Sequence, residues 1–181
     1  FFINGYANKN NETKAAKILR QVWPNEYVSV ATEILPEIRE FERCSTASLN
    51  AYLQPVVANY LARLEDRILK ENSDSEILIV QSNGGIMSVD AAKAFPVRTA
   101  LSGPAAGVVA ARQIASAAGF LNVITCDMGG TSFDVSLVAD GQNILTAQAS
   151  IDFGMVIRTP MIEMSTIGAG GGSIAHIDET G

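Results

Sequence analysis

A short segment in the second half of the chain carries the residues best suited to phosphate chemistry. It reads Asp127-Met128-Gly129-Gly130-Thr131-Ser132-Phe133-Asp134. Paired glycines let backbone N–H groups approach a phosphate without a Cβ in the way, and the Thr131 hydroxyl adds a neutral donor. Asp127, at the end of a predicted buried strand, could hold Mg²⁺, and Asp134 across the turn could converge on the same ion. We predict catalytic and metal-binding roles for Asp127 and Asp134, and phosphate binding by Gly129, Gly130, Thr131 and Ser132.

The same residues also fit a plain hairpin whose glycines only make the turn and whose aspartates are solvated. Short motifs of this kind match by chance in unrelated proteins. The setting favours the functional interpretation, because the motif lies in the first turn of a predicted strand–turn–strand–turn–strand pattern that follows helix and strand elements.

A second glycine-rich segment, residues 168–173, has four glycines in six positions. Gly168, Gly170, Gly171 and Gly172 give backbone access to a ligand from several directions and are candidate cofactor contacts. The segment lacks the Lys-Ser/Thr ending of a P-loop and the G-x-G-x-x-G spacing of a dinucleotide site. The residues alone leave three alternatives open: a loop that lines the nucleotide, a loop that faces the substrate, or a flexible turn between domains.

Two further sites rank lower. Ser102-Gly103-Pro104 at a predicted helix start offers free N–H groups to an anion, but an ordinary polar cap followed by small packing residues explains it better. Asn83-Gly84-Gly85 follows a predicted strand, at the end where open α/β sheets bind ligands.

Other reactive residue types have simpler explanations. His176 is the only histidine and no G-x-S-x-G elbow accompanies it, so we expect a structural or surface role. Cys44 and Cys126 lie too far apart in sequence to suggest a zinc motif or a disulfide framework, and we expect Cys126 to be an inert buried thiol. The mixed charges of residues 39–43 are typical of a solvated face.

Apolar periodicity predicts the elements that position these residues. Helices are expected over residues 12–22, 45–70 and 102–118, with Gly119 closing the last and Pro55 kinking or breaking the second. Residues 27–31 predict a short strand, and the continuous apolar run 77–80 predicts a strand buried on both faces, as in a parallel sheet.

From residue 121 the pattern becomes β. Residues 123–126, 133–138 and 143–148, separated by turn residues, predict a three-stranded antiparallel meander. Residues 162–167 are expected to be extended, and residues 174–177 form an apparent last strand.

Composition limits the function classes. The chain has 181 residues, 48% of them hydrophobic, and a net charge of -6. Such a balance disfavours nucleic acid or an anionic membrane as the partner and leaves a small molecule as the better candidate. Two distant cysteines without a disulfide framework predict a cytoplasmic protein. No apolar run is long enough to span a bilayer, and the first residues lack a basic region followed by an apolar core. The start without Met and the end beside an apparent strand suggest that both termini are cut from a longer protein.

Four ordered motifs resemble the hydantoinase A / 5-oxoprolinase family, and most of all its N-methylhydantoinase A (hydantoin-utilisation) type. They begin at Ser82-Asn83-Gly84-Gly85, Leu101-Ser102-Gly103-Pro104, Asp127 and Thr166-Ile167-Gly168, and the resemblance extends over nearly the whole chain. Glu163 and Ser165 depart from the family pattern, where an Asp and an aromatic or His-like residue are expected. Because of this departure, the resemblance does not fix which ring substrate is used.

The resemblance implies an α/β fold of the actin/hexokinase-like (ribonuclease-H-like) ATPase class, here incomplete, with a mixed sheet, an antiparallel meander and flanking helices. Residues 1–75 would form a mainly helical part with a long connecting helix, and residues 76–181 part of an actin-like ATPase domain. The family has two D-x-G-G-T phosphate loops, and only the second occurs here. The 181 residues alone are therefore expected to bind nucleotide weakly or not at all.

The resemblance further implies an enzyme that uses ATP and Mg²⁺ to open a cyclic amide such as a hydantoin or 5-oxoproline, by phosphorylating the amide oxygen so that water can attack the carbon. A B-type partner subunit is an additional expectation. Two alternatives remain: a subunit of an ATP-dependent ketone carboxylase, and a non-catalytic nucleotide-binding module of the same fold.

Overall fold

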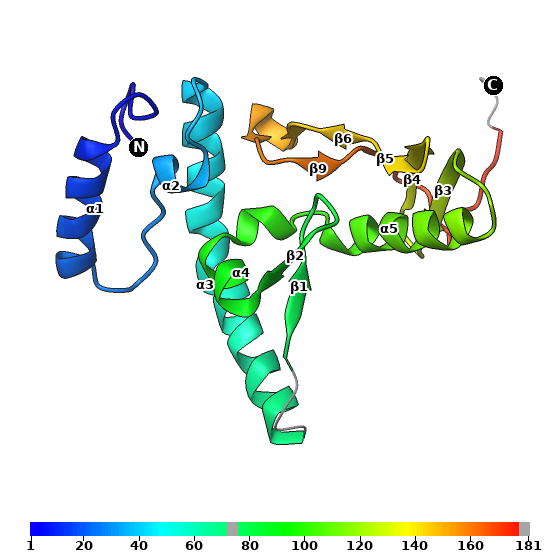
Figure 1. Cartoon of the computed structure of the whole chain (residues 1–181), viewed down its shortest axis with the longest axis horizontal. Coiled ribbons are helices and arrows are strands. Elements are labelled where there is room, and N and C mark those ends of the chain that lie inside the picture. The colour runs from blue at the N-terminus through cyan, green and yellow to red at the C-terminus, as the bar shows by residue number, and fades with distance from the viewer. Residues whose placement is uncertain (72–75, 178–181) are drawn as a thin grey trace.

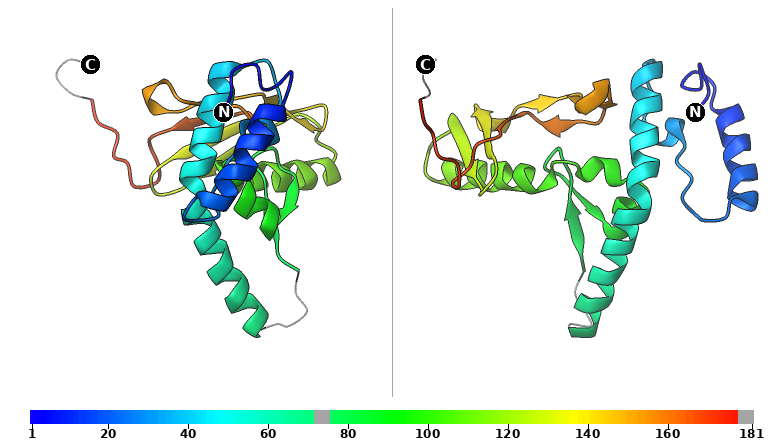
Figure 2. Two further views of the ribbon diagram at one scale, coloured as in Figure 1. Left: turned by 90° about the vertical axis from the view of Figure 1, so that its left-hand side faces the viewer. Right: turned by 180° about the vertical axis from the view of Figure 1, so that it is seen from behind.

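The computed structural model describes residues 1–71 and 76–177. The chain is elongated (Figure 1): α1 (Asn10–Val22) lies at one end, the long helix α3 (Glu40–Glu71) in the middle, and a sheet with helix α5 (Ser102–Ala117) at the other end. The view from behind in Figure 2 shows the same succession. Within the described ranges no helix combines the length and apolar character that a membrane crossing requires.

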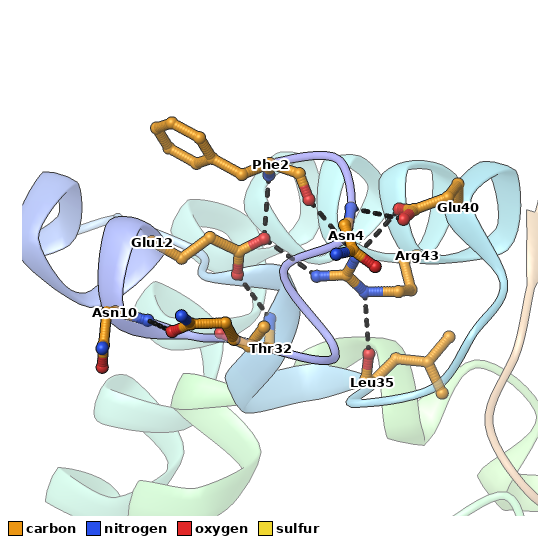
Figure 3. Close-up of polar contacts among 9 residues, drawn as sticks. Phe2, Asn4, Asn10, Glu12, Thr32, Leu35, Glu40 and Arg43 are labelled. Carbon is orange, nitrogen blue, oxygen red and sulfur yellow. Dashed lines mark hydrogen bonds and ion pairs between the residues drawn. The ribbon is translucent and has the colours of Figure 1, made fainter.

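The N-terminal part is fastened to α3 by a buried ion pair. Arg43 of α3 is fully buried, and its Nη2 donates to Glu12 Oε1 of α1 at 2.8 Å. The other Glu12 oxygen accepts from the Thr32 amide at 2.9 Å, and the Phe2 amide donates to Oε1 at 2.8 Å. Figure 3 shows these contacts converging from three segments of the chain. A buried charge is tolerable only when it is paired and hydrogen-bonded, and both conditions hold here.

The expectation of a solvated charge run at residues 39–43 is therefore wrong for Arg43. Its Nη1 also donates to Glu40 Oε2 at 2.9 Å and its Nε to the Leu35 carbonyl at 3.3 Å. A Cβ on Gly5 would lie 2.5 Å from Glu12 Oε1, so only glycine fits against the pair. Charge spacing in the sequence could not reveal a partner located 31 residues earlier.

Helix α3 runs unbroken through Pro55, so of the predicted kink or break the break does not occur. Its buried face continues on both sides of the proline, with Asn50 and Gln54 before it and Leu61 after it. Asn50 Nδ2 and Gln54 Nε2 both donate to the Ala94 carbonyl, at 3.0 and 3.2 Å. These tertiary contacts offset the free-energy cost of the proline, which removes one helical hydrogen bond and clashes with the preceding turn.

The predicted strand at residues 27–31 is irregular backbone that leads into the short helix α2 (Ala31–Ile34). The predicted buried parallel strand is also wrong. β1 (Leu78–Val80) pairs antiparallel with β2 (Ile86–Ser88), and Leu78 is exposed. Gly84 makes the intervening turn with a φ of 82°, a conformation that favours glycine. An apolar run of four residues does not distinguish a strand that is buried on both faces from a hairpin strand that packs on one face only.

The hairpin packs on α3 and on α4 (Val89–Ala94) through Leu61, Val89 and Ala92, with Ile77, Ile79 and Met87 around them. The 3-10 turn η1 (Pro96–Thr99) then leads into α5. Helix α5 ends as predicted, since Gly119 follows with a φ of 88°.

The main sheet has the order β10-β4-β3, formed by β10 (Met164–Ile167), β4 (Phe133–Ala139) and β3 (Val123–Met128), all antiparallel. A two-residue turn at Asp140 and Gly141, both with positive φ, joins β4 to β5 (Gln142–Asn143). The predicted meander is thus confirmed in its first two strands, whereas its third is much shorter than residues 143–148. β10 takes the place beside β4, and residues 174–177 form no strand.

The rest of the predicted third strand turns away from the sheet. β6 (Leu145–Thr146) pairs with β9 (Met161–Ile162), and β7 (Ala149–Ser150) pairs with β8 (Val156–Ile157) beyond the 3-10 turn η2 (Asp152–Gly154). This arm returns to α3, where Ser45 Oγ donates to the Val156 carbonyl at 2.8 Å. Ile157 and Met161 share a core cluster with Ala47 and Val97. The expected extended conformation of residues 162–167 is confirmed by β9 and β10.

Candidate functional site

Asp127 and Asp134 face each other across the β3–β4 ladder. The antiparallel register pairs Asp127 with Asp134 and, on the other side of β4, pairs Asp134 with Thr166 of β10. Directly opposed residues of neighbouring strands project to the same face of a sheet. Two carboxylates and one hydroxyl therefore form a single row across three strands.

The two carboxylates differ in their surroundings. Asp134 Oδ1 accepts a hydrogen bond from Thr166 Oγ1 at 2.6 Å. The Asp127 carboxylate has no hydrogen bond from the described residues, and it points toward α5, where a Cβ on Gly107 would lie 3.9 Å from Asp127 Oδ2. The sequence analysis named Thr166 only as the start of the fourth family motif and gave it no role, and its place opposite Asp134 is visible only in the strand register.

The turn between the two aspartates is narrow and open on one side. The Gly129 amide donates to the Ser132 carbonyl at 2.9 Å, which closes the turn. A Cβ on Gly130 would have no heavy atom within 4 Å, so this glycine faces open space. The Gly130 and Thr131 amides find no backbone acceptor in the part of the chain that the structure describes. Free amides on a Gly-Gly turn are typical of an anion cradle.

The glycine-rich loop of residues 168–173 docks directly on this turn. The Gly171 amide donates to the Gly129 carbonyl at 2.9 Å. Gly170 is buried, and a Cβ there would lie 2.6 Å from the Gly129 oxygen and 2.7 Å from the Thr131 nitrogen. Ser173 closes the loop, because its Oγ accepts from the Gly170 amide at 3.1 Å.

The four predicted glycines of this loop therefore differ in what they contact. Gly170 and Gly171 touch the acidic turn, and a Cβ on Gly172 would lie 3.4 Å from the Gly130 oxygen. A Cβ on Gly168 would meet no heavy atom within 4 Å. The loop lies against the turn through its middle residues.

A cavity of about 450 Å³ lies between α5 and the sheet, with the acidic pair at its wall. Small residues of α5 make room for it, and β3, β4 and β10 form the other side. The lining residues are Pro104, Gly107, Val108, Ala111, Ala115, residues 123–127, residues 134–136 and Met164. Its size is within the range of small-molecule sites.

The strand that carries Asp127 is more exposed than predicted. Ile124 is 67% exposed and Cys126 is exposed, so the expectations of a buried strand and a buried thiol are both wrong. In the described structure β3 pairs only with β4 and α5 lies on one of its faces, so its other edge and face remain open. Both cysteines are free thiols, as expected.

The two lower-ranked candidates differ in place, since one holds its own turn and the other borders the cavity. Asn83 Oδ1 accepts from the Gly85 amide at 2.8 Å and so holds its own turn. The expected polar cap at Ser102 is wrong, because Ser102 begins α5 without a capping hydrogen bond, and Pro104 of the same turn lines the cavity. His176 is exposed, which agrees with the expected surface role. Among residues 1–71 and 76–177, no three or more His, Cys, Asp or Glu side chains gather as metal ligands.

The family model for hydantoinase/oxoprolinase matches residues 43–181. The caprolactamase alpha subunit of Pseudomonas jessenii is 37% identical over 99% of this chain, and the match covers 26% of that protein. Among solved structures, an ATP-dependent caprolactamase from Pseudomonas jessenii aligns with a TM-score of 0.79 at 38% identity, over 97% of this chain and 25% of that one. Nucleotide-free acetone carboxylase, solved in work on ATP-dependent acetone carboxylation, aligns with a TM-score of 0.80 at 26% identity, over 98% of this chain and 25% of that one.

The chain thus spans about a quarter of the length of these relatives. The matched region includes most of α3, the acidic turn and the glycine-rich loop, and it covers more than half of the sequence. On this evidence the chain belongs to the hydantoinase/oxoprolinase family.

Proposed function

We propose that this chain is part of an ATP-dependent enzyme that opens a cyclic amide, and that the turn from Asp127 to Asp134 holds Mg²⁺ and the phosphates of ATP. The observation that carries the proposal is the register of β3 and β4, which sets the two carboxylates face to face on either side of a Gly-Gly turn. The solved caprolactamase and acetone carboxylase act on different substrates, and both are described as ATP-dependent. Because both proteins are described as ATP-dependent although their substrates differ, we assign ATP binding to the region that both share with this chain.

The acidic pair fits Mg²⁺. Like charges directly opposite each other destabilise a strand pair, and a divalent cation between them relieves that repulsion. Mg²⁺ is commonly held by one or two carboxylates together with water and substrate phosphates, so a third protein ligand is not required. When bound, the ion would neutralise charge on the phosphoryl group during its transfer. Asp127 and the Asp134 carboxylate braced by Thr166 are both available to it.

The turn itself fits a phosphate. The Gly130 and Thr131 amides, which lack a backbone acceptor among the described residues, and the open space at Gly130 allow close approach of an anion. Thr131 and Ser132 add hydroxyl donors. The glycine-rich loop supports this site by holding the Gly129 carbonyl away from the anion, through its hydrogen bond to the Gly171 amide. Gly168 and Gly172 are proposed as further contacts for the nucleotide.

The proposed reaction, opening of a ring amide, is taken from the caprolactamase relatives. Phosphorylation of a ring amide oxygen would turn a poor electrophile into one that water can attack, and a lactam or hydantoin-type ring is the proposed substrate.

We assign the fold to the actin/hexokinase-like class, with residues 1–75 as a helical part and residues 76–181 as part of the ATPase domain. The free exposed thiols Cys44 and Cys126 favour the cytoplasm. Since the caprolactamase relative is named as a subunit, a partner subunit is proposed as well.

Substitution of Asp127 tests this function. In the full-length protein, Asp127→Asn should lower lactam-stimulated ATP hydrolysis by at least about 100-fold, because it removes one of two charges that hold the metal. Asp90→Asn is the matched control, since Asp90 on α4 is 95% exposed and lies outside the cavity wall. Unchanged, Mg²⁺-dependent ATP hydrolysis by the Asp127→Asn protein would rule the metal role out. ATP binding without any ATP hydrolysis by the wild type would instead favour the third alternative, a non-catalytic nucleotide-binding module.

The match to acetone carboxylase favours a second candidate, a subunit of an ATP-dependent ketone carboxylase. Both candidates use the same phosphate turn and differ in the substrate that stimulates ATP hydrolysis. Stimulation by a ketone with bicarbonate, and none by a panel of lactams and hydantoins, would select the carboxylase.

A further inference from the structure

Thr166 occupies the third position of the row that begins with Asp127 and Asp134. It is the residue of β10 directly opposite Asp134, and its Oγ1 donates to Asp134 Oδ1 at 2.6 Å. Short bonds from a hydroxyl to a carboxylate are among the stronger hydrogen bonds in proteins. Threonine is branched at Cβ, so its rotamer is restricted and the donor is held in place.

The strand that presents Thr166 is fixed at both sides of this contact. On the N-terminal side, Ser136 Oγ of β4 donates to the Glu163 carbonyl at 2.7 Å. On the C-terminal side, the glycine-rich loop is bonded to Gly129 through the Gly171 amide. β10 and the loop therefore brace the acidic turn at two points: the Asp134 carboxylate and the Gly129 carbonyl. Neither of these two hydrogen bonds involves the Thr166 hydroxyl.

We propose that Thr166 is a positioning residue for the metal site, which orients the Asp134 carboxylate toward the ion that Asp134 and Asp127 share. This inference rests on the proposed function. One Asp134 oxygen is engaged by the hydroxyl, while Asp127 keeps both of its oxygens free of hydrogen bonds from the described chain. Without the hydroxyl, the Asp134 side chain gains rotamers that point away from Asp127, and Mg²⁺ loses a preorganised ligand.

The test is a Mg²⁺ titration of the full-length enzyme with its subunits, followed both by calorimetry of the binding of a non-hydrolysable ATP analogue and by ATP hydrolysis. Thr166→Val keeps the shape and removes the donor, and it should raise the half-saturating Mg²⁺ concentration by about 10-fold, as loss of a residue that orients a metal ligand does. Thr166→Ser restores the hydroxyl and should return the value close to that of the wild type. The KM for the ring substrate should not change in either variant.

Thr146→Val is the control, because the Thr146 hydroxyl on β6 also donates a hydrogen bond, to the Gln148 carbonyl at 3.1 Å, but lies outside the cavity wall. It should titrate like the wild type. The positioning role would be overturned if Thr166→Val had the same half-saturating Mg²⁺ concentration as the wild type. It would also be overturned if Thr166→Ser were as impaired as Thr166→Val. The Asp127→Asn variant separates the two proposals: if it loses Mg²⁺ activation while Thr166→Val does not, only the role of Thr166 fails.

Discussion

At the scale of single residues, the chain places its charges according to burial. The Glu12–Arg43 pair is desolvated and satisfied by backbone groups, whereas Arg20 and Glu33 form an exposed pair at 3.2 Å between α1 and α2. Burial by itself raises the pKa of Glu12, but hydrogen bonds from Thr32 and Phe2 and the charge of Arg43 outweigh it, so the pKa lies below its ordinary value of 4.5.

Removing one member of the buried pair should be costly. Glu12→Ala leaves Arg43 buried without its partner, and we expect a loss of about 3–5 kcal/mol in the free energy of unfolding. Glu33→Ala breaks the exposed pair in the same region and should cost less than about 1 kcal/mol. Urea denaturation at neutral pH measures both. Equal effects of the two substitutions would refute the structural role of the buried pair.

The lowered pKa of Glu12 adds a pH signature. Because the folded state favours the ionised carboxylate, its contribution is complete above the ordinary pKa of 4.5 and is lost as the pH falls through the lower folded value. The stability difference between the wild type and Glu12→Gln should therefore be constant at neutral pH and shrink in acid below about pH 4.5. A difference that grows in acid would contradict this sign.

At the scale of elements, the junction between the acidic turn and the glycine-rich loop is the contact on which the site depends. Gly170→Ala places a Cβ 2.6 Å from the Gly129 oxygen, and a backbone atom cannot move aside as a flexible side chain can. We expect a destabilisation of about 1–3 kcal/mol and a weaker affinity for Mg²⁺–ATP. Gly168→Ala in the same loop meets no atom within 4 Å and should leave the free energy of unfolding unchanged.

Local patterns predicted the elements well where local physics decides them. The period of α3, the closing Gly119 and the Asp140-Gly141 turn each depend on residues a few positions apart, and each is present. The partner of β1 and the burial of Arg43 depend on contacts with distant segments, which periodicity does not encode. The candidate site follows the same division. The Asp127–Asp134 hairpin was predictable, whereas Thr166 and the docking of Gly170 required the fold.

At the scale of the whole molecule, α3 connects a helical N-terminal part to the cavity-bearing sheet (Figure 1). The acidic turn lies at the far end from α1, and β3 beside it has an open edge within the described structure. The chain spans about a quarter of its relatives' length, and under the proposed function the remaining nucleotide contacts would come from the rest of the protein. This placement makes the carboxylate pair, rather than the helical part, the centre of the proposed function.

The most direct measurement is the affinity of the full-length protein for ATP, determined by isothermal titration calorimetry with Mg²⁺ and with EDTA. For the wild type, Mg²⁺ should strengthen ATP binding markedly. For Asp127→Asn, we expect the affinity with Mg²⁺ to fall to the level measured with EDTA. An Asp127→Asn protein that binds Mg²⁺–ATP as tightly as the wild type would contradict the metal role of the acidic pair.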